Sequence, residues 1–205
     1  EWIDRGYEPD PSAVTDEQLT RLAASPLYRG GRHTGVRSRR ELAELLRLYD
    51  AEIHYTDHLV GQMCAYLKKR GWYDDCAVIL SADHGEQYGE GQMILEHGTV
   101  HDSCIHIPML LKLPGGAHRG EVCAHPVYGL DIAPAAARFF GVAAPEMWHG
   151  TALQDTLDGT AAPREYLVCE HGLYTCQRAV LQDGWKMVHT FSPGLWDFAE
   201  YALYH

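Results

Sequence analysis

The stretch at residues 41–70 constrains the fold of this chain more than any other. Its apolar residues recur at steps of three and four, which is the pattern of one face of a long helix. These residues are Leu42, Leu45, Leu46, Tyr49, Ile53, Leu59, Val60, Met63 and Leu67. Gly71 follows, where a helix commonly ends. A shorter helix is predicted over residues 15–24, with Thr15 at its cap.

Two unbroken apolar runs come next and predict strands. The first covers residues 76–80 (CAVIL) and the second covers residues 107–113. Short continuous runs of this kind indicate strands that are buried on both faces. Asp131 then begins another predicted helix, which we expect to stop at Gly141. The order helix, strand, polar loop, strand, helix predicts an α/β fold.

After about residue 144 the pattern changes to that of a small antiparallel sheet. Short strands are predicted at residues 165–169, 177–181 and 185–189. Asp183-Gly184 lies between the last two of them and is a typical two-residue hairpin turn. We therefore expect a small antiparallel sheet appended to the α/β domain.

Composition excludes some functions. The net charge is -11 with histidine neutral, and no stripe of lysine or arginine alternates with aromatic residues, so a nucleic-acid surface is not expected. No apolar run approaches the roughly 20 residues that cross a bilayer. The six cysteines show no spacing typical of a zinc finger.

The polar stretch at residues 81–102, SADHGEQYGEGQMILEHGTVHD, directly follows the first predicted strand. Asp83 and His84 are adjacent candidate metal ligands at the strand end, where ligands gather in α/β sheets. Adjacent side chains on a strand point to opposite faces, so the backbone must turn there, and Gly85 would ease that turn. As a bare tripeptide, Asp-His-Gly fits equally well with an Asp83 that caps a loop and a His84 that is only polar.

His97 is the next candidate, because the glycine-containing loop before it could bring it back to Asp83 and His84. An imidazole titrates near neutral pH, so it can protonate a leaving oxygen or hold an anionic ester. Without that context, a lone loop histidine is more simply a solvent-exposed side chain.

Several motifs together resemble the sulfatase family of the alkaline phosphatase superfamily. They are SADHGEQYGE, EHGTVHDSCIHIPMLLKLPG, VYGLDIAPAAARFFGV and RAVLQDGWKMVH, in that order. The resemblance covers residues 41–205 and implies the C-terminal part of an alkaline phosphatase-like sandwich, a mixed sheet flanked by helices. On this basis residues 1–145 are expected to belong to the catalytic domain. Residues 146–205 are expected to form a small antiparallel C-terminal subdomain that is truncated.

The resemblance also implies a site. Asp83 and His84 match the family's later pair of metal ligands, and His97 matches the residue that contacts the sulfate or the leaving group. We expect calcium as the divalent metal, with manganese or zinc as alternatives because His84 is a nitrogen ligand. The implied substrate is a small anionic ester.

The family's nucleophile is a formylglycine made within a C/S-x-P-x-R motif, and no cysteine or serine of this chain stands in such a motif. The paired acidic ligands near the family's N-terminus also have no counterpart here. We therefore expect this chain to be a C-terminal piece of a sulfatase that needs the missing N-terminal half as its partner. Alone it is expected to be inactive.

Two other functions stay open at the level of sequence. One is a phosphonate or phosphate ester hydrolase of the same superfamily, which resembles the phosphonate monoester hydrolases and shares the metal and the base. The other is a non-catalytic α/β binding module that has kept the scaffold.

Overall fold

The computed structural model describes residues 15–24, 36–89, 94–173, 175–194 and 198–205. Their helices are α1 (Asp16–Ala24), α2 (Arg39–Lys69), α3 (Asp102–Ile105), α4 (Ile132–Phe139) and α5 (Leu153–Leu157), with 3-10 turns η2 (Pro114–Gly116) and η3 (Gly129–Asp131). Their strands are β1 (Val78–Ser81), β2 (Gln87–Tyr88), β3 (Ile94–Glu96), β4 (Met109–Lys112), β5 (Leu167–His171), β6 (Cys176–Gln182), β7 (Trp185–Ser192) and β8 (Tyr201–Tyr204).

The long predicted helix is confirmed as α2. Its first turn is closed by a capping box, in which the Glu41 N–H donates to Ser38 Oγ and the Ser38 N–H donates to the Glu41 carboxylate. At its other end Gly71 takes a left-handed φ of 71°, as a residue that follows a helix often does. The shorter helix α1 and the helix before Gly141, α4, also lie where the sequence predicts them.

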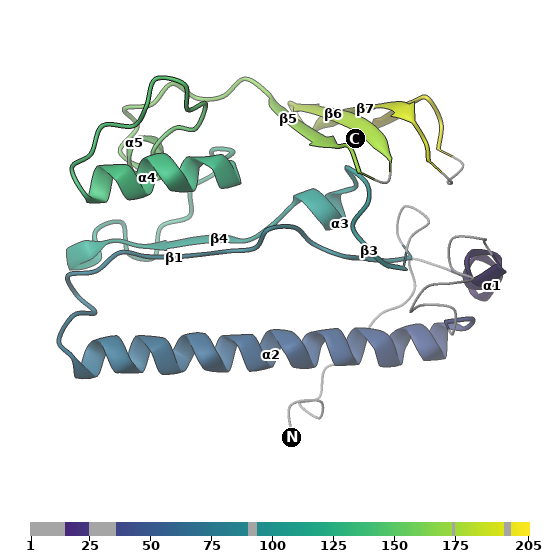
Figure 1. Cartoon of the computed structure of the whole chain (residues 1–205), viewed down its shortest axis with the longest axis horizontal. Coiled ribbons are helices and arrows are strands. Elements are labelled where there is room, and N and C mark those ends of the chain that lie inside the picture. Colours follow the sequence, from purple (N-terminus) through teal and green to yellow (C-terminus); the bar gives the residue numbers. More distant parts are fainter. Residues whose placement is uncertain (1–14, 25–35, 90–93, 174, 195–197) are drawn as a thin grey trace.

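The strands β1 and β4 pair antiparallel, with Ile79 opposite Leu111. In Figure 1 they run between α2 on one side and α4 with α5 on the other. The prediction that these strands are buried on both faces was wrong, because Leu80 is 37% exposed and Leu110 is 56% exposed. Among the described residues this sheet has two strands, so each strand is paired along one edge only.

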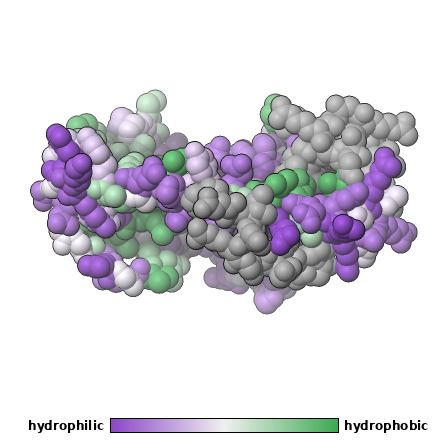
Figure 2. All heavy atoms as spheres, turned by 90° about the horizontal axis from the view of Figure 1, so that it is seen from below, coloured by the Kyte–Doolittle hydropathy of each residue, from purple (hydrophilic) through white to green (hydrophobic). Residues whose placement is uncertain are grey.

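The helix α2 also keeps apolar side chains at the surface. Leu48, Ile53, Met63 and Tyr66 are each about half exposed, and Leu42 is its one buried residue among those described. Viewed from below, from the α2 side of Figure 1, the surface mixes hydrophilic and hydrophobic side chains (Figure 2). In the described part of the chain, no helix combines the length and the apolar character that a membrane span requires.

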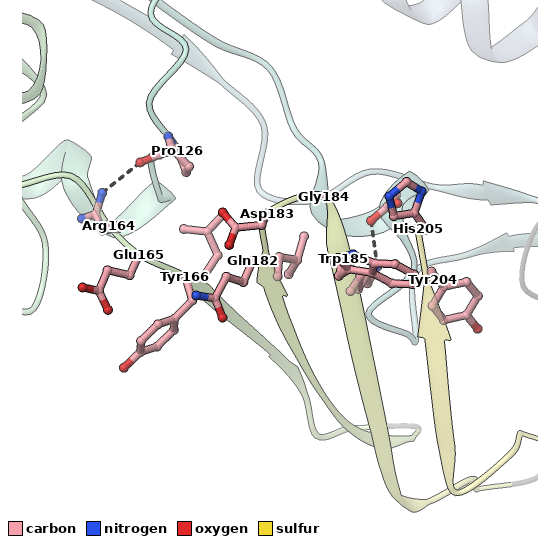
Figure 3. A pocket seen from close by; sticks show the side chains of 14 residues that line it. Pro126, Arg164, Glu165, Tyr166, Gln182, Asp183, Gly184, Trp185, Tyr204 and His205 are labelled. Atoms are coloured by element: carbon pink, nitrogen blue, oxygen red, sulfur yellow. Dashed lines mark hydrogen bonds and ion pairs between the residues drawn. The ribbon is translucent and has the colours of Figure 1, made fainter.

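The predicted C-terminal sheet is confirmed, with four strands in the order β5-β6-β7-β8. Asp183 and Gly184 connect β6 to β7 with φ values of 50° and 79°, and Figure 3 shows this turn beside Trp185 and His205. Two positive φ values are what this tight hairpin turn requires. The strand β8 was not predicted.

The sheet packs on the polar stretch after β1 through a small core. Ala179 and Val188, from β6 and β7, contact the buried Val100. Val100 lies between His97 and α3 in the chain. The C-terminal sheet is therefore packed directly against the segment that carries the candidate site.

Candidate functional site

The strand β1 ends at Ser81, so Asp83 and His84 lie in irregular backbone just beyond it. The His84 N–H donates to Asp83 Oδ1 at 3.0 Å. This hydrogen bond is the main cause that lowers the pKa of Asp83, so the carboxylate is ionised and available at neutral pH. Its side chain is 87% exposed.

The imidazole of His84 is held in one orientation. Its Nδ1 lies 3.0 Å from the Gly85 carbonyl oxygen. A carbonyl only accepts, so Nδ1 carries the proton and Nε2 is left with a lone pair. That Nε2 lies 3.6 Å from Asp83 Oδ2. Two ligands at about 2.0–2.4 Å from one cation are at most about 4.8 Å apart, so both atoms can reach the same ion.

Gly85 is needed for a reason other than the one expected from the sequence. Its φ lies outside the left-handed region, so conformational freedom does not require a glycine here. A Cβ would instead lie 1.9 Å from the backbone oxygen of Ser103, and the Gly85 N–H donates to the Cys104 carbonyl at 2.8 Å. Gly85 therefore allows the Asp83-His84 segment to pack closely against the backbone of α3.

The structure brings His97 to this pair. The His84 and His97 rings stack with centroids 3.7 Å apart and an interplanar angle of 20°. The cause is local, because β2 and β3 pair with Gln87 opposite Glu96. Continuing this pairing by one residue places Glu86 beside His97, and His97 Nδ1 lies 3.0 Å from Glu86 Oε1. A carboxylate accepts this bond, so His97 Nε2 is the ring nitrogen left for other partners.

Sequence reasoning missed Glu86. Its side chain is 23% exposed, and its Oε2 is buried with no hydrogen-bond partner among the described residues. Among the described residues, Glu86, His84 and His97 form a group whose ligand atoms lie within 4.8 Å of one another. No local pattern marked Glu86, because it reaches His97 only through the pairing of Gln87 with Glu96.

These donors fit a divalent cation. Asp83 and His84 offer a carboxylate and an imidazole that converge, and in the described part of the chain His84 also belongs to the group with Glu86 and His97, which does not include Asp83. Manganese and zinc accept such a mixed set readily, whereas calcium prefers oxygen. The chemistry of the site therefore suits metal binding beside a histidine that can donate or accept a proton.

The three candidate residues open into a pocket of about 470 Å³. Its walls include apolar side chains from α3 and β5, such as Ile105 and Val168, and two further histidines, His149 and His171. Burial, followed by the neighbouring charge of His97, lowers the pKa of His171, which favours its neutral form. No pattern in the sequence marked either histidine.

The model of the family described as Sulfatase matches residues 5–142, which is more than half of the chain. The chain belongs to the sulfatase family. The "multifunctional alkaline phosphatase superfamily protein PehA" of Trinickia caryophylli is 24% identical over 155 residues, covering 73% of this chain and 30% of PehA. Choline-sulfatase of Rhizobium meliloti is 26% identical over 148 residues, covering 70% of this chain and 28% of that enzyme.

Two solved structures share the fold of this chain. The phosphonate monoester hydrolase of Silicibacter pomeroyi matches with a TM-score of 0.70 and 22% identity, over 91% of this chain and 41% of that one. A 2-O GAG sulfatase matches with a TM-score of 0.68 and 20% identity, over 96% of this chain and 43% of that one. The predicted α/β class and family are confirmed. The chain spans under half of each solved neighbour and about 30% or less of the curated relatives named above.

Proposed function

We propose that this chain forms one side of the active site of a sulfuric ester hydrolase. The observation that carries the proposal is that Asp83, His84 and His97 meet in one pocket just beyond β1. Membership of the sulfatase family supports sulfate esters as the substrate class. The substrate is then a small anionic ester whose alcohol faces the walls built by α3 and β5.

Each of the three residues has a proposed role. Asp83 and His84 hold the divalent cation through Oδ2 and Nε2, which lie 3.6 Å apart. When bound, the cation neutralises charge on the ester oxygens. His97 protonates the departing oxygen or binds the sulfate through Nε2, because Glu86 holds its Nδ1.

The remaining groups belong to sequence outside residues 1–205. We propose that a formylglycine nucleophile and two further acidic ligands are supplied there, because no C/S-x-P-x-R motif occurs in this chain. The complete enzyme is this chain together with the sequence that carries that motif. We also propose that residues 1–145 belong to its catalytic domain and residues 146–205 to a small C-terminal subdomain.

Calcium is the metal that the family resemblance implies, and it remains our proposal. Asp83 supplies an oxygen ligand of the kind that calcium prefers, whereas the imidazole of His84 is a donor that manganese and zinc accept. Elemental analysis of the complete enzyme decides between them. Calcium at one ion per chain supports the proposal, and a stoichiometric transition metal overturns it.

The second candidate function is phosphonate monoester hydrolysis. It is favoured by the nitrogen ligand His84 and by the likeness to the Silicibacter pomeroyi hydrolase. A phosphonate monoester carries one negative charge next to its leaving oxygen, as a sulfate monoester does, so the same cation and acid suit both.

One comparison of substrates tests the proposal. The complete enzyme is assayed with an aryl sulfate, an aryl phosphonate monoester and an aryl phosphodiester that share one leaving group. A kcat/KM for the sulfate at least about tenfold above the others, about 1.4 kcal/mol of transition-state preference, supports a sulfatase. Preference for the phosphonate establishes the second candidate instead. Absence of turnover with all three supports a non-catalytic binding module and contradicts both enzyme functions.

A further inference from the structure

The backbone that follows His97 is held by side chains of the C-terminal sheet. Thr175, just before β6, donates its hydroxyl proton to the Gly98 carbonyl at 2.6 Å. Its side chain is buried, with 2% of the residue exposed. A buried hydroxyl that lost this acceptor would be left unsatisfied at a cost of about 1–3 kcal/mol. The contact therefore fixes the peptide unit between Gly98 and Thr99, one residue beyond His97.

Gln177 makes the second attachment. Its Oε1 accepts the Val100 N–H at 3.2 Å, and its Nε2 donates to Thr190 Oγ1 at 3.2 Å. The bond from Val100 fixes which end of the amide faces the segment, because a backbone N–H only donates and must meet the amide oxygen. Gln177 is 5% exposed. Two successive strands thus hold this side chain in place.

The same segment is attached at two more points. Lys186 of β7, 7% exposed, donates to Asp102 Oδ1 at 2.7 Å. From the other side, the fully buried Gln87 accepts the hydroxyl proton of Thr99 at 2.9 Å. Apolar contacts such as Val100 on Ala179 resist separation but tolerate sliding, whereas these directional bonds fix the register of residues 98–102.

We propose that Thr175 and Gln177 are positioning residues for His97. Through them the C-terminal sheet determines where the His97 imidazole lies, although His97 is not part of that sheet. The proposal rests on the function proposed above for His97. Proton transfer to a leaving oxygen needs a heavy-atom distance of about 2.6–3.2 Å. A displacement of about 1 Å can cost about 100-fold in rate. Residues that hold the Gly98 and Val100 backbone can therefore control turnover without touching substrate.

A pair of matched substitutions at Thr175 separates shape from hydrogen bonding. In the complete enzyme, Thr175→Val keeps the shape and loses the hydroxyl, and Thr175→Ser keeps the hydroxyl and loses a methyl. We expect Thr175→Val to lower kcat about tenfold for aryl sulfates with poor leaving groups and less than about threefold for the best one. KM should change less than about twofold, and Thr175→Ser should restore the leaving-group dependence of the wild type.

The control is Gln154→Met, placed away from the pocket. Gln154 is also a buried side chain that donates to a backbone carbonyl, that of Ala135, at 3.1 Å. Its unfolding temperature is measured beside that of Thr175→Val, and its leaving-group slope should be unchanged. If both variants change the slope equally, or neither does, the effect of Thr175 is structural and the inference is wrong.

A double-mutant cycle with His97 completes the test. If Thr175 acts through His97, Thr175→Val should lower kcat by less than about twofold in a His97→Ala background. A full tenfold loss in that background overturns the inference while leaving the role of His97 intact. A His97→Ala variant with equal losses across leaving groups contradicts the proposed acid role itself. If Thr175→Val does not fold, Gln177→Met takes its place in the same cycle, with the same expected outcomes.

Discussion

Replacing Gly85 with alanine probes the close approach that holds the Asp83-His84 pair against α3. The added Cβ would meet the Ser103 backbone oxygen at 1.9 Å, and contacts of a Cβ under 3.0 Å essentially never occur. The two backbone segments must therefore separate by at least about 1.1 Å. Because the obstacle is backbone on both sides, no side-chain rotation can relieve the contact.

The magnitude follows from two effects. Overpacking of a close contact costs about 1–3 kcal/mol. The same separation would stretch the 2.8 Å bond from the Gly85 N–H to the Cys104 carbonyl beyond hydrogen-bond range, at about 0.5–1.5 kcal/mol. We expect the free energy of unfolding to fall by about 2–4 kcal/mol. Displacing the ligand pair should also weaken metal binding about 10- to 100-fold, as loss of support around metal ligands does.

The assay measures thermal unfolding and metal affinity of the complete enzyme. At about 2–4 °C per kcal/mol for a cooperative unit of this size, the midpoint should fall by about 4–16 °C. Gly61→Ala is the matched control, because Gly61 lies inside α2 with no atom within 4 Å of its added Cβ. It should raise stability by about 0.5–1 kcal/mol and leave metal affinity unchanged.

If Gly85→Ala unfolds at the wild-type temperature and binds metal as tightly as the wild type does, the close approach of Gly85 to α3 constrains neither the fold nor the ligand pair. A loss of stability with unchanged metal affinity would refute one half of this prediction, namely that this contact positions the ligand pair.

Two predictions concern parts of the fold outside the site. Bonds from Glu121 and then Asp158 raise the pKa of His118 above its ordinary value near 6.5. Its stabilisation should therefore be complete below about pH 6.5 and be lost as pH rises through the raised pKa. His118→Asn, which tolerates the left-handed backbone there (φ 56°), should lower the unfolding temperature at pH 6 and converge with wild type by pH 9. An unfolding-temperature difference that is constant with pH would contradict this. Arg164→Met should cost about 2–4 kcal/mol of unfolding free energy, because Arg164 pairs at 2.6 Å with the fully buried Asp131. Unchanged chemical denaturation would contradict this and show that the backbone N–H groups of Tyr128 and Thr151, which also donate to the Asp131 carboxylate, suffice.

Arg164, shortly before β5, also contacts the segment that contains η3. Beyond its ion pair with Asp131, it donates to the Pro126 carbonyl at 3.2 Å, a bond drawn in Figure 3. Its guanidinium lies 5.0 Å from the centre of the Tyr128 ring. The Arg164 side chain thus contacts Pro126, Tyr128 and Asp131 at once.

The sequence predicted those parts of the fold that local signals determine. The helix α2 was predicted from its apolar periodicity and from Gly71 directly after it, whereas its Ser38 cap was found only in the structure. The hairpin at Asp183-Gly184 is likewise encoded by two adjacent residues. Strands β2, β3 and β8 were missed, because strands of two, three and four residues that lack a local pattern depend on pairing with their partner strands.

The candidate site divides in the same way. Asp83, His84 and His97 were found because they share one stretch of sequence and one family motif. Glu86 was missed because its importance comes from the pairing of Gln87 with Glu96, which places it beside His97. Thr175 lies 77 residues from Gly98, whose carbonyl accepts its hydroxyl proton. Such contacts arise only when the C-terminal sheet packs on the loop, so no local pattern could reveal them.

The most direct test of the central claim is the metal content of the complete enzyme with and without Asp83. Wild type and Asp83→Ala are dialysed against metal-free buffer, reloaded with calcium or manganese, and analysed for bound metal per chain. We expect one tightly bound divalent ion per chain in the wild type. In Asp83→Ala we expect that ion to be lost together with nearly all sulfatase activity. Unchanged metal content in Asp83→Ala would remove Asp83 from the ligand set and contradict the site proposed here.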